Sequence, residues 1–148
     1  MKETGYTLVE LAVVIALLGI FLAIGLPILD APLASFVLDE AAWRLARDLR
    51  QIQHLAIMQE EWFKVEFQHP LDRYVISRSG EIWAIVDLPP GVEMNLTSFR
   101  HNQLFFYPSG APSMGGTIPL THRRGGERYV KVTVGAGRVR VTGEGESE

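Results

Sequence analysis

Residues 11–29, LAVVIALLGIFLAIGLPIL, contain no charged side chain, and this run limits the possible folds more than any other part of the chain. As an α-helix with a rise of 1.5 Å per residue, the run would extend roughly 28 Å, which is close to the thickness of the hydrocarbon core of a bilayer. Inside lipid every backbone polar group must be bonded within its own segment, so a helix is the expected form. The sequence therefore predicts a membrane-spanning helix near the N-terminus.

The residues alone leave three interpretations of this helix. The first is a secretory signal peptide cut near residues 31–34, although its polar start should be basic and here Lys2 is set against Glu3 and Glu10. The second is a plain single-pass anchor, which gives no reason for Glu10 at the edge of the run. A carboxylate at membrane depth costs on the order of 3 kcal/mol, so such residues usually have a partner and a task. The third interpretation gives Glu10 such a partner.

The segment around Glu10 carries the third interpretation. GYTLVE (residues 5–10), followed at once by the apolar run, resembles the type III signal of type IV pilins and type II secretion pseudopilins. That family has a short polar leader ending in glycine, then an aromatic residue and Thr-Leu-x-Glu. With Tyr6 as the first mature residue, Gly19 and Pro27 fall where the family has a helix-loosening glycine and a proline.

The resemblance implies a chemistry of processing and assembly. A membrane-embedded aspartyl prepilin peptidase would cut between Gly5 and Tyr6, where glycine suits an active site that approaches the backbone closely. In the family the freed terminal ammonium, here that of Tyr6, is then N-methylated. Glu10 would neutralise this ammonium on a neighbouring subunit, because at low dielectric the pair is favourable while either charge alone is expensive.

A second helix should follow the proline. Pro27 has no N–H to donate and should kink the first helix near Ala23, and the resemblance implies that the stretch with Gly19 and Pro27 loosens when subunits pack. From Ser35 to about Glu61, apolar residues recur at steps of three and four, which predicts an amphipathic helix whose apolar stripe packs against a sheet. The stripe consists of Leu38, Ala41, Ala42, Leu45, Leu49, Ile52 and Ala56.

From Trp62 onward the apolar period changes to two, and turn signals separate several short segments. This pattern predicts antiparallel sheet, and with the preceding helices an α+β fold. The expected strands lie at 62–67, 73–77, 81–86, 92–96, 103–107, 117–121 and 129–134, and residues 139 and 141 close the pattern. The expected divisions of the chain are a leader (1–5), a hydrophobic transmembrane and assembly helix (6–29), an amphipathic helix (30–61), a β-sheet domain (62–142) and an acidic tail (143–148).

The C-terminal half carries a second resemblance. FxPxG at 106–110, GTIxL at 116–120 and GRVRV at 137–141 together resemble the C-terminal signature of GspH/FimT-type minor pseudopilins. The two resemblances imply a pilin-like fold. In it a long N-terminal helix, membrane-spanning in its first half and amphipathic in its second, packs on a C-terminal antiparallel β-sheet domain.

Charge is distributed unevenly along the chain. Residues 30–99 carry six basic and eleven acidic side chains, and residues 100–148 carry seven and four. The formal net charge of −3 is not that of a general nucleic-acid binder. On a strand, however, Arg138 and Arg140 would point to the same side and could bind phosphates. The other candidates for this surface are Arg123, Arg124, Arg128 and Lys131.

Two interpretations of these basic residues stay open. In FimT-type competence pilins the Gly-Arg-x-Arg motif is implicated in binding DNA for uptake, and the resemblance extends that role to Arg138 and Arg140. The alternative is a solvated sheet face, or arginines paired with acidic groups of the adjacent helix or of a neighbouring subunit. The acidic tail that follows Arg140 would repel or shield a phosphate.

The sequence contains no pattern typical of an enzyme, a metal site or a cofactor site. It has no cysteine, which excludes zinc–thiolate sites and thiol catalysis. The four histidines are scattered without ligand spacing. No P-loop, dinucleotide or Gly-x-Ser-x-Gly motif is present. We therefore expect no metal, no cofactor and no enzymatic activity.

Together these observations predict a minor pilin or pseudopilin of a type II secretion pseudopilus or a type IV pilus, acting near the tip or as an initiator. It would be made as a prepilin and inserted in the cytoplasmic (inner) membrane with its N-terminus in the cytoplasm and its globular half outside. The expected partners are other pilins, the prepilin peptidase and methyltransferase, and the membrane. The alternative is a DNA-binding minor pilin of a competence pilus, with DNA as a further partner.

Overall fold

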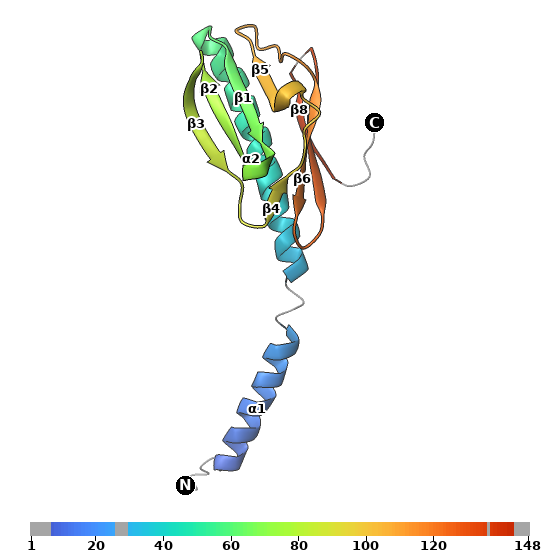
Figure 1. The fold of residues 1–148 in the computed structure, drawn as a ribbon. Helices are drawn as coiled ribbons and strands as arrows, with labels where there is room; N and C mark the ends of the chain where they lie inside the picture. Colours follow the sequence, from blue (N-terminus) through green and yellow to red (C-terminus); the bar gives the residue numbers. More distant parts are fainter. Residues whose placement is uncertain (1–6, 26–29, 136, 144–148) are drawn as a thin grey trace. The chain divides into compact units, whose positions relative to one another are not determined.

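The structure, a computed structural model, describes residues 7–25, 30–135 and 137–143. The chain divides into two compact units, residues 1–33 and residues 34–148. The first contains helix α1, and the second contains most of helix α2 and all of the β-strands (Figure 1).

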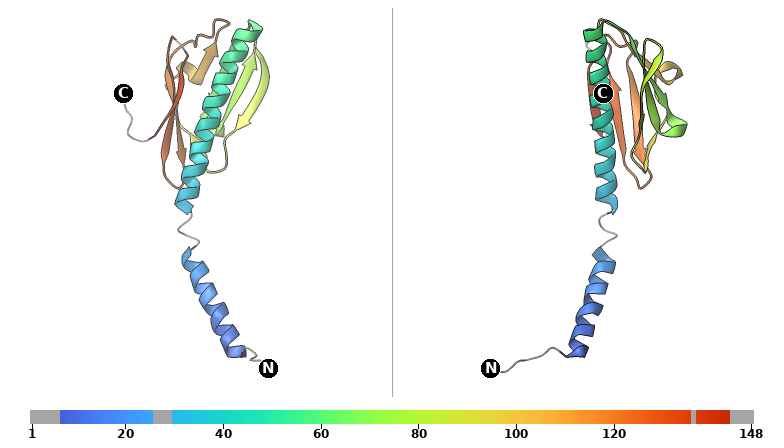
Figure 2. Two further views of the ribbon diagram at one scale, coloured as in Figure 1. Left: turned by 180° about the vertical axis from the view of Figure 1, so that it is seen from behind. Right: turned by 90° about the vertical axis from the view of Figure 1, so that its left-hand side faces the viewer.

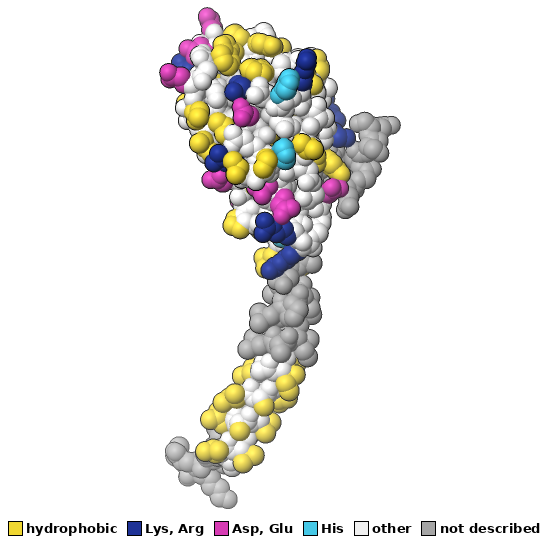
Figure 3. All heavy atoms as spheres, in the orientation of Figure 1, with side chains coloured by type: hydrophobic (Ala, Val, Ile, Leu, Met, Phe, Trp, Pro, Cys, Tyr) yellow, Lys and Arg dark blue, Asp and Glu magenta, His cyan; other side chains and the backbone are white. Residues whose placement is uncertain are grey.

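Helix α1 (Leu8–Gly25) forms from the apolar run. Every residue from Leu8 to Phe21 is exposed, and hydrophobic side chains cover the face of the helix seen in Figure 3. Among the described residues, no helix has the length and hydropathy required to cross a membrane. Pro27, and with it the site of the predicted kink, lies outside the described residues.

Helix α2 (Asp30–Gln59) begins at the first residue of the expected amphipathic division (30–61), before the apolar pattern starts at Ser35. Pro32 lies in its first turn, where a missing N–H costs nothing. Glu60, with a φ of 54°, ends the helix in the left-handed conformation typical of the residue after a C-cap. The predicted apolar stripe is confirmed, because all of its members are buried: Leu38, Ala41, Ala42, Leu45, Leu49, Ile52 and Ala56.

The strands pair antiparallel, as predicted, and divide between two four-stranded sheets. The first sheet has the order β3-β2-β1-β5 and the second β4-β6-β7-β8, and α2 lies along one side of both (Figure 2). The first contains β1 (Phe63–Gln68), β2 (Arg73–Arg78), β3 (Glu81–Asp87) and β5 (Gln103–Phe106). The second contains β4 (Val92–Met94), β6 (Gly116–His122), β7 (Glu127–Val132) and β8 (Val139–Gly143). Two single 3-10 turns, η2 (His69–Leu71) and η3 (Arg100–Asn102), lie in the connections.

One hydrophobic core joins α2 to both sheets. On β1 the side chains alternate between buried and half-buried, and Phe67 stacks on Phe99 with ring centroids 5.5 Å apart. The largest buried side chain is Tyr74 of β2, whose hydroxyl donates a hydrogen bond to Oδ2 of Asp48 on α2. Burial, followed by the hydrogen bond to the Asp48 carboxylate, raises the pKa of Tyr74 far above its ordinary value. The first sheet is thus tied to the helix by a phenol that stays protonated in the folded protein.

This environment predicts an alkaline loss of stability that depends on Tyr74. A tyrosine of the unfolded chain ionises near pH 10. Because the pKa of Tyr74 is raised in the folded state, its contribution to the free energy of unfolding is full below about pH 10 and falls as the pH rises further, by up to about 1.4 kcal/mol per pH unit. The free energy of unfolding of a fragment of residues 30–148 can be measured in urea between pH 7 and pH 11. Tyr74→Phe should reduce its decrease with rising pH. Tyr107→Phe, at an exposed ring, should keep it, and equal slopes in the two variants would contradict the assignment.

Candidate functional site

The N-terminal end of α1 is built around Thr7 and Glu10. The backbone N–H of Glu10 donates to the Thr7 carbonyl (3.1 Å) and also to Thr7 Oγ1 (3.3 Å), so Thr7 caps the helix. Thr-x-x-Glu is the spacing of a capping box. Glu10 therefore lies in the first turn, where the helix dipole favours a carboxylate. The Thr-x-x-Glu spacing is visible in the sequence, so this local role of Glu10 could have been predicted from it.

The described part of the chain offers Glu10 no cationic partner. Its side chain is exposed, and no ion pair within residues 7–25, 30–135 and 137–143 involves it. Gly19 lies on α1, and nothing is within 4 Å of the position that a Cβ would take there. The predicted cleavage residues, Gly5 and Tyr6, lie outside the described residues. What the structure presents here is an apolar helix whose first turn carries one carboxylate.

The structure separates the basic residues that the sequence grouped on one surface. Arg123, at the β6–β7 turn, pairs with Glu93 of β4 (Nε–Oε1, 2.6 Å), and this hydrogen bond raises the pKa of Arg123. Arg128 of β7 donates two hydrogen bonds to the Asp39 carboxylate of α2, one from Nε and one from Nη2. Arg128 therefore has the partner on the adjacent helix that one of the two interpretations expected, whereas the partner of Arg123 lies on a strand of the second sheet.

The remaining basic candidates lie on or beside β7 and β8. The backbone N–H of Arg124 donates to Nδ1 of His122 (3.1 Å). Lys131 of β7 is half-buried and is the register partner of Arg140 on β8. Arg138, just before β8, and Arg140 are both exposed. Arg138 and Arg140 are therefore on the surface, and the side chain of Arg124 is exposed as well.

Arg138 and Arg140 line a groove of about 430 Å³ between β8 and α2. Helix α2 contributes Arg50 and His54, so three guanidinium groups and one imidazole border the same space. The other lining residues are Gln53, Gly137 and Val139, and none of the described lining residues is acidic. The groove can therefore bind an anion with several oxygens, such as a phosphate diester. Arg50 and His54 could not be predicted as part of this groove, because their spacing on α2 does not reveal which strand they meet.

The glycines of the C-terminal signature hold this groove together. Gly137 has a φ of 60°, and a Cβ there would collide with the Gln53 amide. Gly110 has a φ of 78°, and its Cβ would lie 2.6 Å from Cδ1 of Ile57. The Gln53 amide donates to the Gly110 carbonyl (2.7 Å), and the Arg50 guanidinium donates to the carbonyl at the start of β8 (2.7 Å). FxPxG and GRVRV therefore both contact α2 directly.

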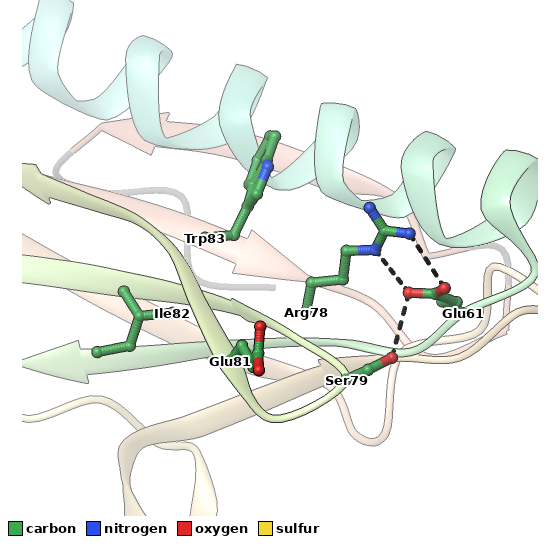
Figure 4. Close-up of a pocket in the computed structure, with 6 residues that line it drawn as sticks. All are labelled: Glu61, Arg78, Ser79, Glu81, Ile82 and Trp83. Atoms are coloured by element: carbon green, nitrogen blue, oxygen red, sulfur yellow. Dashed lines mark hydrogen bonds and ion pairs between the residues drawn. The ribbon is translucent and has the colours of Figure 1, made fainter.

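A second pocket, of about 470 Å³, lies where β2 turns into β3 (Figure 4). Arg78 and Glu61 form a two-point ion pair (2.6 and 3.0 Å), and the Ser79 hydroxyl also donates to Glu61 (3.2 Å). The hydrogen bond from Arg78 lowers the pKa of Glu61. Because this pair is mutually neutralised, the pocket mainly presents Trp83 and Ile82 beside Glu81.

The chain was compared with known proteins. Residues 1–26 match the family described as the prokaryotic N-terminal methylation motif. The fold is similar to that of the minor pseudopilin EpsH from the type 2 secretion system of Vibrio cholerae, with a TM-score of 0.63 and 17% identity over 74% of this chain and 98% of that chain. It is also similar to the type IV minor pilin FimU of Pseudomonas aeruginosa, with a TM-score of 0.57 and 18% identity over 71% and 87% of the two chains. Comparison with curated protein sequences gives no match.

The chain therefore joins an N-terminal methylation motif to the fold of minor pseudopilins and minor pilins. The predicted α+β, pilin-like fold is confirmed, and the match over residues 1–26 confirms the predicted methylation motif at the N-terminus.

The docking role of the signature glycines predicts a difference between two alanine substitutions. Gly137→Ala should lower the free energy of unfolding by about 1–3 kcal/mol, because the new Cβ meets Gln53 and the backbone is left-handed there. Gly143→Ala, at the end of β8, should change it by less than about 0.5 kcal/mol, because the site is open. Urea unfolding of residues 30–148 measures both. If both variants lose the same stability, Gly137 has no special role in docking.

Proposed function

We propose that this chain is a minor pilin or pseudopilin, a structural subunit that joins a filament of a type II secretion system or a type IV pilus through its N-terminal helix. The observation that carries the proposal is the combination of the methylation motif over residues 1–26 with the minor-pseudopilin fold. Either feature alone would admit other roles. A subunit whose work is packing against other subunits needs no catalytic centre, and we assign it none.

Processing supplies the charge that assembly requires. A prepilin peptidase would remove residues 1–5 by cutting between Gly5 and Tyr6, and a methyltransferase would modify the new N-terminus at Tyr6. The methylated amine stays cationic. It would immediately precede Thr7, the cap of α1, in the mature chain.

In the filament, neighbouring subunits would then cover α1. The helix exposes apolar side chains on every side, and burying apolar surface is worth roughly 25 cal/mol per Å². Glu10 is the single ionisable group on this surface, and in a filament its carboxylate would pair with the Tyr6 ammonium of a neighbouring subunit. Gly19 and Pro27 would let the helix loosen as neighbours close on it. Before assembly the apolar run would hold the chain in the cytoplasmic membrane, with the N-terminus cytoplasmic and the β-sheet domain outside.

The test of this proposal separates the charge of Glu10 from its capping role. Glu10→Ala removes both, whereas Glu10→Gln removes the charge and keeps a residue that suits a capping box. If the carboxylate pairs with a neighbour's ammonium, both variants should fall at least tenfold in filament incorporation, measured by immunoblot of sheared filaments. Restoration of incorporation by glutamine would mean that Glu10 only caps the helix.

Intact mass of the membrane-bound protein is the control for this experiment. The wild type and both variants should lack residues 1–5 and carry one methyl group, because the cut precedes Tyr6 and does not need the filament. A mature chain that starts at Met1, or near residue 31, would refute the proposed function itself.

The basic groove favours a second candidate function, DNA binding by a minor pilin of an uptake pilus. One groove is bordered by four basic side chains, and none of its described lining residues is acidic: Arg50, His54, Arg138 and Arg140. Phosphate contacts from such a cluster would give affinity that is independent of sequence and sensitive to salt. The described lining contains no phenylalanine, tyrosine or tryptophan on which bases could stack, so contacts to the phosphate backbone would carry most of the affinity.

A gel shift with residues 30–148 and duplex DNA at low salt tests this second function. The fragment should retard DNA, and the double variant Arg138→Ala/Arg140→Ala should not. Arg50→Ala should weaken binding, and it should reduce the slope of log affinity against log salt concentration by the amount expected for about one phosphate contact. The matched control is Arg123→Ala, because Arg123 is already paired with Glu93. Absence of any shift by the wild-type fragment at low ionic strength would remove this function.

A further inference from the structure

The two sheets have four edges, and three of them are short or partly covered by the chain itself. An edge strand presents unpaired N–H and C=O groups to which another strand can add. Along β5, the N–H of Ser113 donates to the Phe105 carbonyl (2.8 Å). Strand β4 has three residues, and the N–H of Met94 donates to Asp72 (2.9 Å). The first carbonyl of β8 accepts a hydrogen bond from Arg50.

The fourth edge, β3, is different. It is seven residues long, and within the described residues its backbone has no hydrogen-bond partner besides β2. Its sequence, EIWAIVD, contains neither lysine nor proline, the residues that commonly protect such edges. Strand β3 is therefore the long edge of the described structure that no other segment covers, although a register shift within the β2–β3 pair and an acidic residue at each end of the strand give it some protection.

Apolar side chains flank this edge on both faces. Ile82, Trp83 and Ile85 are 66, 51 and 50% exposed. Ile82 and Ile85 pair with residues of β2 that lie two positions apart, so they share a face of the sheet. A register shift at this point lets Trp83 turn to the opposite face, where its ring meets Phe63 (centroids 6.0 Å apart). Figure 4 shows Ile82 and Trp83 on opposite sides of the strand. A strand added here would bury apolar surface above and below.

We propose that the outer edge of β3 accepts an extended segment of another filament subunit by β-strand addition. The segment would alternate apolar and polar side chains and carry a basic residue near each end, facing Glu81 and Asp87. The pocket of about 470 Å³ beside Trp83 would receive one of its terminal side chains. This proposal rests on the proposed function, because the occupant is a neighbour in the filament.

Charge argues against a second copy of β3 as the occupant. Antiparallel pairing of two such strands, centred on Ala84, would place Glu81 of each copy opposite Asp87 of the other. Like charges directly opposite each other destabilise a strand pair. The acidic ends of β3 thus select a strand with basic ends, and they disfavour aggregation through this edge.

The absence of cysteine from the chain gives a clean test in full-length protein. Ile82→Cys and Ile85→Cys are labelled with a maleimide in cells that assemble the filament and in cells that lack the other subunits. Assembly should slow labelling of both at least tenfold. Leu96→Cys and Val134→Cys, at side chains that are similarly exposed, are the matched controls. Equal labelling of the β3 and control cysteines in the assembled state would overturn the proposal.

Amide hydrogen exchange distinguishes strand addition from a contact between side chains alone. Exchange of the β3 amides should slow at least tenfold between the full-length protein in detergent and the same protein in the filament. Unchanged exchange, even with protected cysteines, would overturn strand addition. Processing and incorporation of the wild-type protein distinguish failure of this inference from failure of the proposed function. If it is processed and incorporated while β3 stays unprotected, only the inference about β3 fails. If it is neither processed nor incorporated, the proposed function fails.

Discussion

The packing of one helix stripe against two sheets is the constraint on which the globular unit depends. The stripe combines large side chains with small ones, and all of its members are buried: Leu38, Leu45, Leu49 and Ile52, with Ala41, Ala42, Ala46 and Ala56. The small side chains let the sheets approach the helix closely, and the large ones fill the space between strands. Because the two sheets meet through this shared core, loss of the stripe would remove the surface on which both are assembled.

Polar tethers on both sides of this stripe fix the helix against the sheets. Asp48 accepts from Tyr74 of the first sheet, and Asp39 pairs with Arg128 of the second. Gln53 fastens the loop of the C-terminal signature. Each such bond contributes on the order of 1 kcal/mol, far less than apolar burial does. Their effect is on position, since each is formed only in one alignment of helix and strand.

The parts of the fold that the sequence predicted are those that local periodicity determines. The stripe of α2 and the alternation of β1 follow from steps of three to four and of two, and both are confirmed. Long-range pairing is not encoded in this way. Nothing near Phe63 or Phe106 indicates that their strands lie side by side, as they do, so neither the division into two sheets nor the free edge of β3 was predicted. The same holds for the site: GRVRV revealed Arg138 and Arg140, but their neighbours on α2 depend on tertiary packing.

The tethers also separate the surfaces to which we assign different roles. Asp48 marks the side of α2 that meets β2, next to the edge strand β3, whereas Arg50 and Gln53 mark the side that meets the C-terminal signature and β8. The candidate strand-addition edge is acidic at its ends, and the groove is basic. A partner strand with basic ends would be repelled by the groove, and a phosphate backbone would be repelled by β3. If both proposals hold, one subunit would bind a neighbour through its first sheet while the groove beside its second sheet stays open to an anion, without competition between the two ligands.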